Sequence, residues 1–161
     1  MVRVLIKKLD PKVTLPSYKT KGASGMDLMA FIKEKIVIKP RTSALIPTGL
    51  SVAFSEDYEI QIRPRSGLAA KNNISVLNTP GTIDSDYRGE LKIILFNHGN
   101  ENFTINNNDR IAQMVLTPII KMDLDETNEL PETVRGKGGF GSTGKWKIFW
   151  TNHKLKDIPD N

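Results

Sequence analysis

The segment YEIQIR, residues 58–63, decides the fold class. Its apolar residues Tyr58, Ile60 and Ile62 alternate with polar ones, so the two kinds of side chain point to opposite faces. A period of two residues is the pattern of a half-buried β-strand. The segment therefore predicts a strand with one face on an apolar core.

Segments of similar character lie on both sides of this strand. Proline and glycine separate short, β-branched apolar runs, which predict further strands. These runs are residues 2–8, 35–39, 43–54, 91–97, 103–105 and 110–117. The dense run 91–97 predicts a strand buried on both faces. Residues 106–109 (NNND) predict a hairpin connection between the last two runs.

Helical periodicity is weak along the chain. Only residues 66–71 (SGLAAK) predict a short helix, with Ser66 as its N-cap. Many short strands separated by turn residues are typical of a β-sandwich or a β-barrel. We therefore expect an all-β fold.

Composition narrows the class of protein. The chain has 161 residues, 39% of them hydrophobic, as expected for one globular domain. It has no apolar run near the roughly 18–20 residues of a membrane span and no export signal, so we expect a cytoplasmic protein without membrane contact. Cysteine is absent and histidine occurs only at His98 and His153, which excludes disulfides, thiol nucleophiles and a three-histidine metal site within one chain. The net charge of +5 is compatible with an anionic partner or simply with a solvated basic surface.

The chain changes character from about Met122. Residues 122–133 are acidic and residues 136–145 are rich in glycine. A glycine-rich segment cannot build a core, so we expect a barrel domain at 1–134, a flexible arm at 135–145 and an extension of unknown role at 146–161. The arm matches G-x-G-x-x-G and G-x-x-x-x-G-K, but it lacks the preceding strand and following helix that these nucleotide motifs require. Its amides and hydroxyls can grip a phosphate, although composition alone favours a linker.

Three further segments carry candidate chemistry. Residues 64–69 (PRSGLA) join a strand to a helix, where arginine, serine and glycine donors can bind an anion. Residues 81–90 (GTIDSDYRGE) predict a hairpin in which Asp84, close to an aromatic residue, can orient a water as a general base. Asp27 can cap a helix or lie near a metal. Each segment taken alone also fits an ordinary polar turn.

Taken in order, the segments resemble the five motifs of the homotrimeric dUTPase family. The matching segments are 23–30 (ASGMDLMA), 64–69, 81–90, 110–115 (RIAQMV) and 135–144, with GGFGSTG in the last. The resemblance covers about residues 1–145. It implies a jelly-roll-like β-barrel that assembles as a three-fold homotrimer, in which the arm closes over an active site shared between subunits.

The resemblance also implies a reaction. Family members hydrolyse dUTP to dUMP and pyrophosphate, with water attacking the α-phosphorus and with Mg²⁺ as cofactor. The reaction limits uracil incorporation into DNA and supplies dUMP for thymidylate synthesis. Magnesium keeps several waters and is held mainly by the substrate phosphates, so no all-protein metal site is expected.

Residue roles follow from the same resemblance. Asp84 matches the residue that activates water, and Tyr87 matches the aromatic that stacks under the deoxyribose and excludes a ribose 2′-hydroxyl. The residues that match the uracil contacts are Asn78, Gly81, Thr82, Ile83 and Phe140. Those that match the phosphate contacts are Arg65, Ser66, Gly67, Gln113, Arg135, Ser142 and Thr143. Asp27 matches an aspartate near the metal and phosphates, which acts through water or through a buried arginine.

Two other classes of protein remain open. A dCTP deaminase resembles dUTPases in fold but attacks the base, and a non-catalytic module would only sense nucleotides. Tyr87 and the complete glycine-rich motif favour the pyrophosphatase, and Asp84 disfavours a pure sensor. We expect no stable nucleic-acid binding, because no long aromatic and basic stripe is present. The extension at 145–161 departs from the family, whose members usually end soon after the glycine-rich motif.

Overall fold

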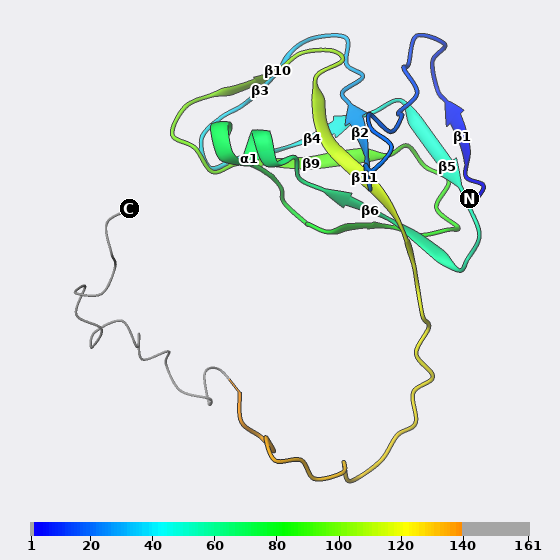
Figure 1. Ribbon diagram of the computed structural model, residues 1–161. Coiled ribbons are helices and arrows are strands. Elements are labelled where there is room, and N and C mark those ends of the chain that lie inside the picture. The colour runs from blue at the N-terminus through cyan, green and yellow to red at the C-terminus, as the bar shows by residue number, and fades with distance from the viewer. Residues whose placement is uncertain (1, 140–161) are drawn as a thin grey trace, which may run out of the picture. The chain divides into compact units, whose positions relative to one another are not determined.

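The computed structural model describes residues 2–139 of the chain. Two compact units divide it, Met1–Lys121 and Met122–Asn161, and the division falls where the composition changes. The first unit holds all the regular secondary structure of residues 2–139 (Figure 1). Within that described range, no helix combines the length and the apolar character that crossing a membrane requires.

The first unit consists of short strands and one helix. In chain order they are β1 (Leu5–Lys8), β2 (Met26–Met29), β3 (Ile36–Ile38), β4 (Ser43–Pro47), β5 (Leu50–Ala53), β6 (Tyr58–Arg63), α1 (Ser66–Asn72), β7 (Ile74–Val76), β8 (Gly81–Ile83), β9 (Lys92–Asn97), β10 (Phe103–Ile105) and β11 (Arg110–Pro118). Each predicted strand run contains at least one of these strands, and the expected helix is α1. Proline and glycine at positions 47 and 49 separate β4 from β5, as their turn chemistry predicts.

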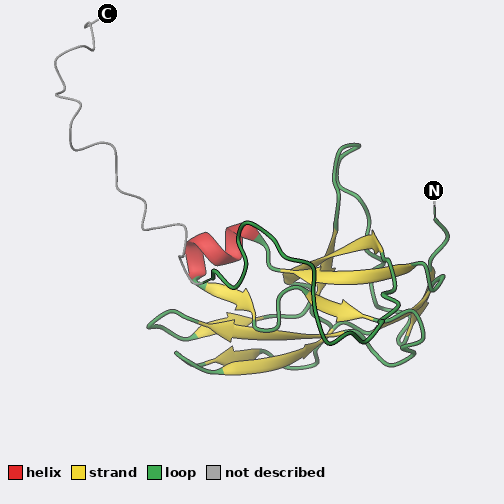
Figure 2. Ribbon diagram, turned by 90° about the horizontal axis from the view of Figure 1, so that it is seen from below, coloured by secondary structure: helices red, strands yellow, loops and turns green. Residues whose placement is uncertain are grey.

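The strands pair antiparallel in four small sheets. Their orders are β1-β5, β10-β3, β2-β11-β6-β8 and β4-β9-β7. The strands are stacked in layers, and α1 lies outside them beside β7 (Figure 2). This arrangement is a jelly-roll-like barrel and confirms the predicted all-β class.

The core of the barrel is aliphatic. Ile60 and Ile62 of β6 are 2% and 3% exposed, so the alternation in YEIQIR places the apolar face in the core as predicted. Leu28, Ile46 and Leu91 are fully buried around them. Burying a side chain of this size stabilises the fold by about 1.5–3 kcal/mol.

Four local predictions were wrong. Residues 81–90 do not form a hairpin, because β8 pairs with β6 and the next strand, β9, belongs to another sheet. In β9, Ile93 and Leu95 are buried but the opposite face is only half-buried, so the strand is not enclosed on both sides. The NNND turn does not close a hairpin, because β10 pairs with β3 whereas β11 pairs with β2 and β6. The N-cap of α1 is Arg65 rather than Ser66, and no side chain caps the helix.

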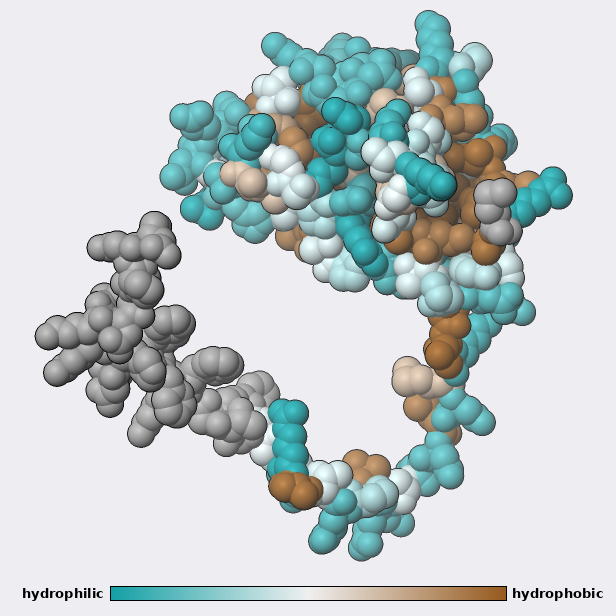
Figure 3. Space-filling view, in the orientation of Figure 1, coloured by the Kyte–Doolittle hydropathy of each residue, from teal (hydrophilic) through white to brown (hydrophobic). Residues whose placement is uncertain are grey.

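The surface of the barrel is mostly polar in the view of Figure 3, but apolar surface gathers over β1 and β5 near the N-terminus. A groove there is lined by Leu5, Ile6, Val52 and Ala53, together with Arg88. Leu5 is 56% exposed although it lies in a strand.

Candidate active site

Strand β11 brings three polar residues of distant sequence into one row. Gln113 of β11 pairs with Asp27 of β2 on one side and with Arg63 of β6 on the other. Side chains that lie opposite each other in a sheet share a face. The row therefore joins the motifs at 23–30 and 110–115 to the end of β6, where residues 64–69 begin.

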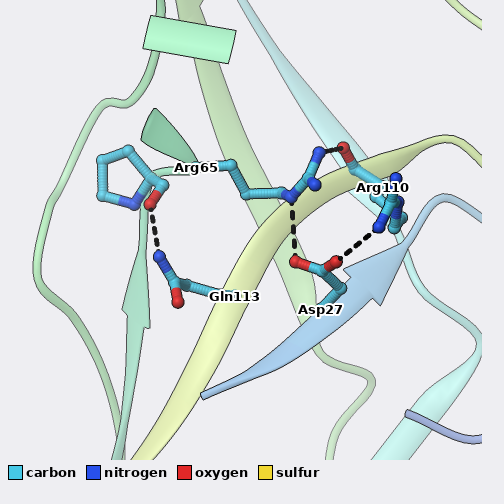
Figure 4. Close-up of polar contacts among 5 residues, drawn as sticks. Asp27, Arg65, Arg110 and Gln113 are labelled. Carbon is cyan, nitrogen blue, oxygen red and sulfur yellow. Dashed lines mark hydrogen bonds and ion pairs between the residues drawn. The ribbon is translucent and has the colours of Figure 1, made fainter. Parts of the chain in front are cut away.

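Asp27 lies between two arginines (Figure 4). Its Oδ1 accepts a hydrogen bond from Arg65 Nε at 2.8 Å, and its Oδ2 accepts one from Arg110 Nη1 at 3.2 Å. Arg65 Nη1 also donates to the main-chain oxygen of Arg110 at 3.1 Å. Because the side chain of Asp27 is only 19% exposed, these ion pairs are partly shielded from water. The carboxylate thus fixes the guanidinium of Arg65 at the start of α1.

The turn between β6 and α1 is held by Gln113. Its Nε2 donates to the main-chain oxygen of Pro64 at 2.9 Å. A Cβ built on Gly25 would lie 2.9 Å from Gln113 Oε1, so the glycine leaves room for this side chain. Ser66 and Gly67, the first residues of α1, are exposed beside the turn.

An open groove of about 520 Å³ runs along this turn, and we call it the Gln113 groove. Its lining residues are Gln61, Arg63, Pro64, Ser66, Thr79, Pro80 and Gln113. Its polar lining consists of amide, hydroxyl and guanidinium side chains, which are groups that can donate to phosphate oxygens. In this structure Arg63 Nε and Nη2 donate to Gln61 Oε1. The structure therefore brings Ser66 and Gln113, two of the residues predicted to contact phosphate, to one groove. Their phosphate-binding role stays a prediction.

A second groove, of about 290 Å³, contains the predicted base, and we call it the Asp84 groove. Its lining residues are Leu45, Thr82, Ile83, Asp84, Tyr87, Glu90, Lys92 and Ile94. Asp84 is exposed, and its main-chain oxygen accepts a hydrogen bond from the Tyr87 amide at 3.1 Å, which closes the turn between them. Tyr87 is 45% exposed, and its hydroxyl donates to the main-chain oxygen of Glu90 at 3.1 Å. The groove thus combines a carboxylate with an aromatic ring, and it shares no lining residue with the Gln113 groove.

The predicted uracil segment contains a close contact between backbone and side chain. A Cβ on Gly81 would lie 3.1 Å from Asn78 Nδ2 and 3.3 Å from Ile62 Cβ. Glycine at the start of β8 therefore allows the Asn78 side chain to pack against the strand. Asn78 is itself exposed before β8.

The arm is only partly described. Arg135 is exposed, and its Nε donates to the main-chain oxygen of Gly138 at 2.8 Å. Phe140, Ser142 and Thr143 lie outside the described residues, so their predicted roles stay predictions.

Within residues 2–139, no three histidine, aspartate or glutamate side chains gather closely enough to hold a metal ion. Both oxygens of Asp27 bind arginine nitrogens, which suits a positioning role better than direct metal ligation. Such a donor set fits a divalent cation that takes most of its oxygen ligands from a bound triphosphate and from water.

Arg110 is a further residue of this cluster. It contributes a side chain to Asp27 and a main-chain oxygen to Arg65, although it was not among the predicted site residues. In a regular strand Arg110, three residues before Gln113, would point to the opposite face, but the register of β11 against β2 shifts between Arg110 and Ala112. The local sequence therefore carried no signal for this residue.

A β-barrel with one polar groove and a second groove holding a carboxylate beside an aromatic ring suits the class of nucleotide-hydrolysing proteins. The dUTPase family model matches residues 11–144, and the chain belongs to this family. It is 54% identical over 144 residues to the deoxyuridine 5′-triphosphate nucleotidohydrolase of Nautilia profundicola, covering 89% of this chain and 100% of that protein. The enzyme of the same name from Treponema denticola is 57% identical over 137 residues, with 85% and 95% of the two chains covered.

Solved structures are similar as well. A structure of the Staphylococcus bacteriophage 80alpha dUTPase with dUPNHPP superposes with a TM-score of 0.79 at 26% identity, covering 89% of this chain and 99% of that one. The family resemblance inferred from the five motifs is therefore confirmed.

Proposed function

We propose that this protein is a dUTP diphosphatase, which hydrolyses dUTP to dUMP and pyrophosphate. The observation that carries the proposal is the Asp84 groove, where an exposed carboxylate and Tyr87 lie side by side in the segment that matches the third family motif. A carboxylate accepts hydrogen bonds from both a water and a sugar hydroxyl, which suits it to orient the attacking water and the deoxyribose. Attack on the α-phosphorus then releases pyrophosphate.

Each group of residues has a proposed task. Tyr87 packs against the deoxyribose, and its bulk excludes a 2′-hydroxyl. Asn78, Gly81, Thr82 and Ile83 contact the uracil edge. Ser66 and Gln113, which line the Gln113 groove, bind the phosphates together with Arg65 and Gly67 of the adjoining turn, and Asp27 positions Arg65. Mg²⁺, held mainly by phosphate oxygens, would neutralise charge on the triphosphate.

The arm completes the site in this proposal. Arg135, Ser142 and Thr143 hold the outer phosphates, and Phe140 stacks over the uracil when residues 135–145 close over the nucleotide. Closure excludes water from the reacting groups. Residues 1–134 then form the barrel domain, and 146–161 remain an extension without an assigned role.

We also propose that the active unit is a cytoplasmic homotrimer with sites shared between subunits. Two observations support this assembly. The Gln113 and Asp84 grooves share no lining residue within one chain, and Leu45, beside Asp84, is 55% exposed. A neighbouring chain that covers this surface would bury Leu45 and bring a phosphate wall to Asp84. Light scattering of the full chain should give three times the 18.0 kDa chain mass.

The direct test is pyrophosphate release from dUTP with Mg²⁺, run beside dCTP, dTTP and UTP. Release from dUTP alone supports the reaction, the base selectivity and the sugar selectivity together. Ammonia release from dCTP would support a deaminase instead. Binding of dUTP without turnover, persisting after deletion of residues 145–161, would support a nucleotide sensor.

A further inference from the structure

The ring of Tyr87 occupies space that only a glycine at position 89 leaves open. A Cβ built on Gly89 would overlap the Tyr87 hydroxyl oxygen and would lie 2.5 Å from Cζ and 2.9 Å from Cε2 of the ring. Non-bonded carbon atoms prefer separations of about 3.5–4.0 Å. Any side chain at position 89 is therefore incompatible with the observed place of the ring.

Backbone conformation does not explain this glycine. The φ angle of Gly89 lies outside the left-handed region, unlike that of Gly49 at +68°. The φ angle of Gly89 therefore does not itself require glycine. The contact with Tyr87 is thus the feature that requires glycine here.

The main chain beneath the ring is fixed to the barrel. Glu90, whose main-chain oxygen accepts from the Tyr87 hydroxyl, also accepts a hydrogen bond from the Gly49 amide through its own Oε1 at 2.8 Å. The next amide, that of Leu91, donates to the main-chain oxygen of Leu50 at 2.7 Å, and Leu91 is fully buried. A Cβ at position 89 would therefore displace the half-exposed ring rather than the backbone.

We propose that Gly89 is a specificity-determining residue. Because it has no side chain, the ring of Tyr87 can occupy the position in which it contacts deoxyribose and excludes ribose. The inference rests on the proposed function, because the contact between Tyr87 and the sugar is itself proposed. Gly89 acts through Tyr87 and is a positioning residue, not a catalytic one. The main-chain oxygen of Glu90 also holds the ring in this position by accepting a hydrogen bond from the Tyr87 hydroxyl.

The test is the ratio of kcat/KM for dUTP to that for UTP in the full-length protein. In Gly89→Ala the added methyl group displaces the Tyr87 ring. We therefore expect the ratio of kcat/KM for dUTP to that for UTP to fall by roughly fivefold or more, and kcat/KM for dUTP itself to fall roughly tenfold. Gly22→Ala is the matched control, because a Cβ at Gly22 meets nothing within 4 Å. That variant should keep both values of the original protein.

A double variant distinguishes displacement of the Tyr87 ring from a general loss of structure. If Gly89 acts through the ring, adding Gly89→Ala to Tyr87→Ala should change the ratio by less than about twofold. Where Gly89→Ala alone fails to fold, the double variant should recover a cooperative thermal transition, because the overlapping ring is gone. Failure to recover it would overturn the inference.

The outcomes distinguish this inference from the proposed function. An original protein that hydrolyses dUTP and UTP equally would refute the sugar role of Tyr87, and Gly89 would have nothing to position. If the unsubstituted protein prefers dUTP and the Gly89→Ala variant keeps the same ratio of kcat/KM for dUTP to that for UTP, the positioning role of Gly89 would be refuted. The proposed function would then still hold.

Discussion

Replacing Asp27 by asparagine should weaken both the fold and the phosphate site. The change removes the charge that holds Arg65 at 2.8 Å and Arg110 at 3.2 Å, and it turns an amide nitrogen toward a guanidinium. The Arg65 pair is well shielded, with side chains 25% and 19% exposed, so it should contribute about 1.5 kcal/mol. Arg110 is 53% exposed, so its pair should contribute only about 0.5 kcal/mol.

The two ion pairs together should contribute about 2 kcal/mol to the free energy of unfolding, and their loss can be measured in two ways. For a chain of this length it corresponds to a decrease in Tm of roughly 4–8 °C, measured by calorimetry at fixed protein concentration. A similar loss of transition-state binding through Arg65 would lower kcat/KM for dUTP by roughly tenfold to thirtyfold. Asp123→Asn, which removes the same charge from an exposed position, is the control and should change neither value.

A double-mutant cycle with Arg65→Gln isolates the pair. We expect a coupling free energy of about 1.5 kcal/mol between positions 27 and 65. A coupling below about 0.3 kcal/mol would mean that the two side chains act independently, and it would refute the assignment of Asp27 as the residue that positions Arg65.

Three other changes have defined outcomes. Asp84→Asn should lower turnover by about 10²–10⁴-fold while dUTP still binds, because the general base is lost and its shape kept; near-normal turnover would remove Asp84 from that role. Truncation after Glu132 should leave a folded oligomer with poor kcat/KM, and an unfolded product would make the arm structural. Asn97→Ala should reduce the free energy of unfolding by roughly 2–4 kcal/mol, since the 1% exposed Asn97 bonds the oxygens of Ile38 and Glu101 and the amide of Gly99; an unchanged urea midpoint would contradict this.

The strands could be predicted because their signal is local. Alternation in residues 58–63 and the breaks at Pro47 and Gly49 depend on neighbouring residues alone, and the structure confirms both. Strand partners are not local. The tight NNND turn predicted a hairpin, but the turn passes the chain from one sheet to another: β10 pairs with β3, whereas β11 pairs with β2 and β6.

The site divides in the same way. The order of the motifs predicted Asp27, Arg65 and Gln113 as site residues, and the family resemblance implied water or one arginine beside Asp27. Nothing in the local sequence indicated that Asp27 would bind two arginines. Arg110 became visible only through the register of β11 against β2. The N-cap of α1 differed from the prediction for a related reason: Arg65 takes that position, with its side chain drawn away to Asp27.

The two grooves differ in how firmly their residues are built into the barrel. Gln113 lies on β11, which is hydrogen-bonded to a neighbouring strand along each edge. Asp84 and Tyr87 lie in an exposed turn whose main-chain amides make few hydrogen bonds. Amide hydrogens of β11 should therefore exchange with solvent only on global unfolding, and those of the turn by local opening. Nucleotide binding would slow exchange mainly in the turn. Under the proposed function, the sugar contact would therefore open locally while the strand that carries the phosphate-binding residue Gln113 stays folded.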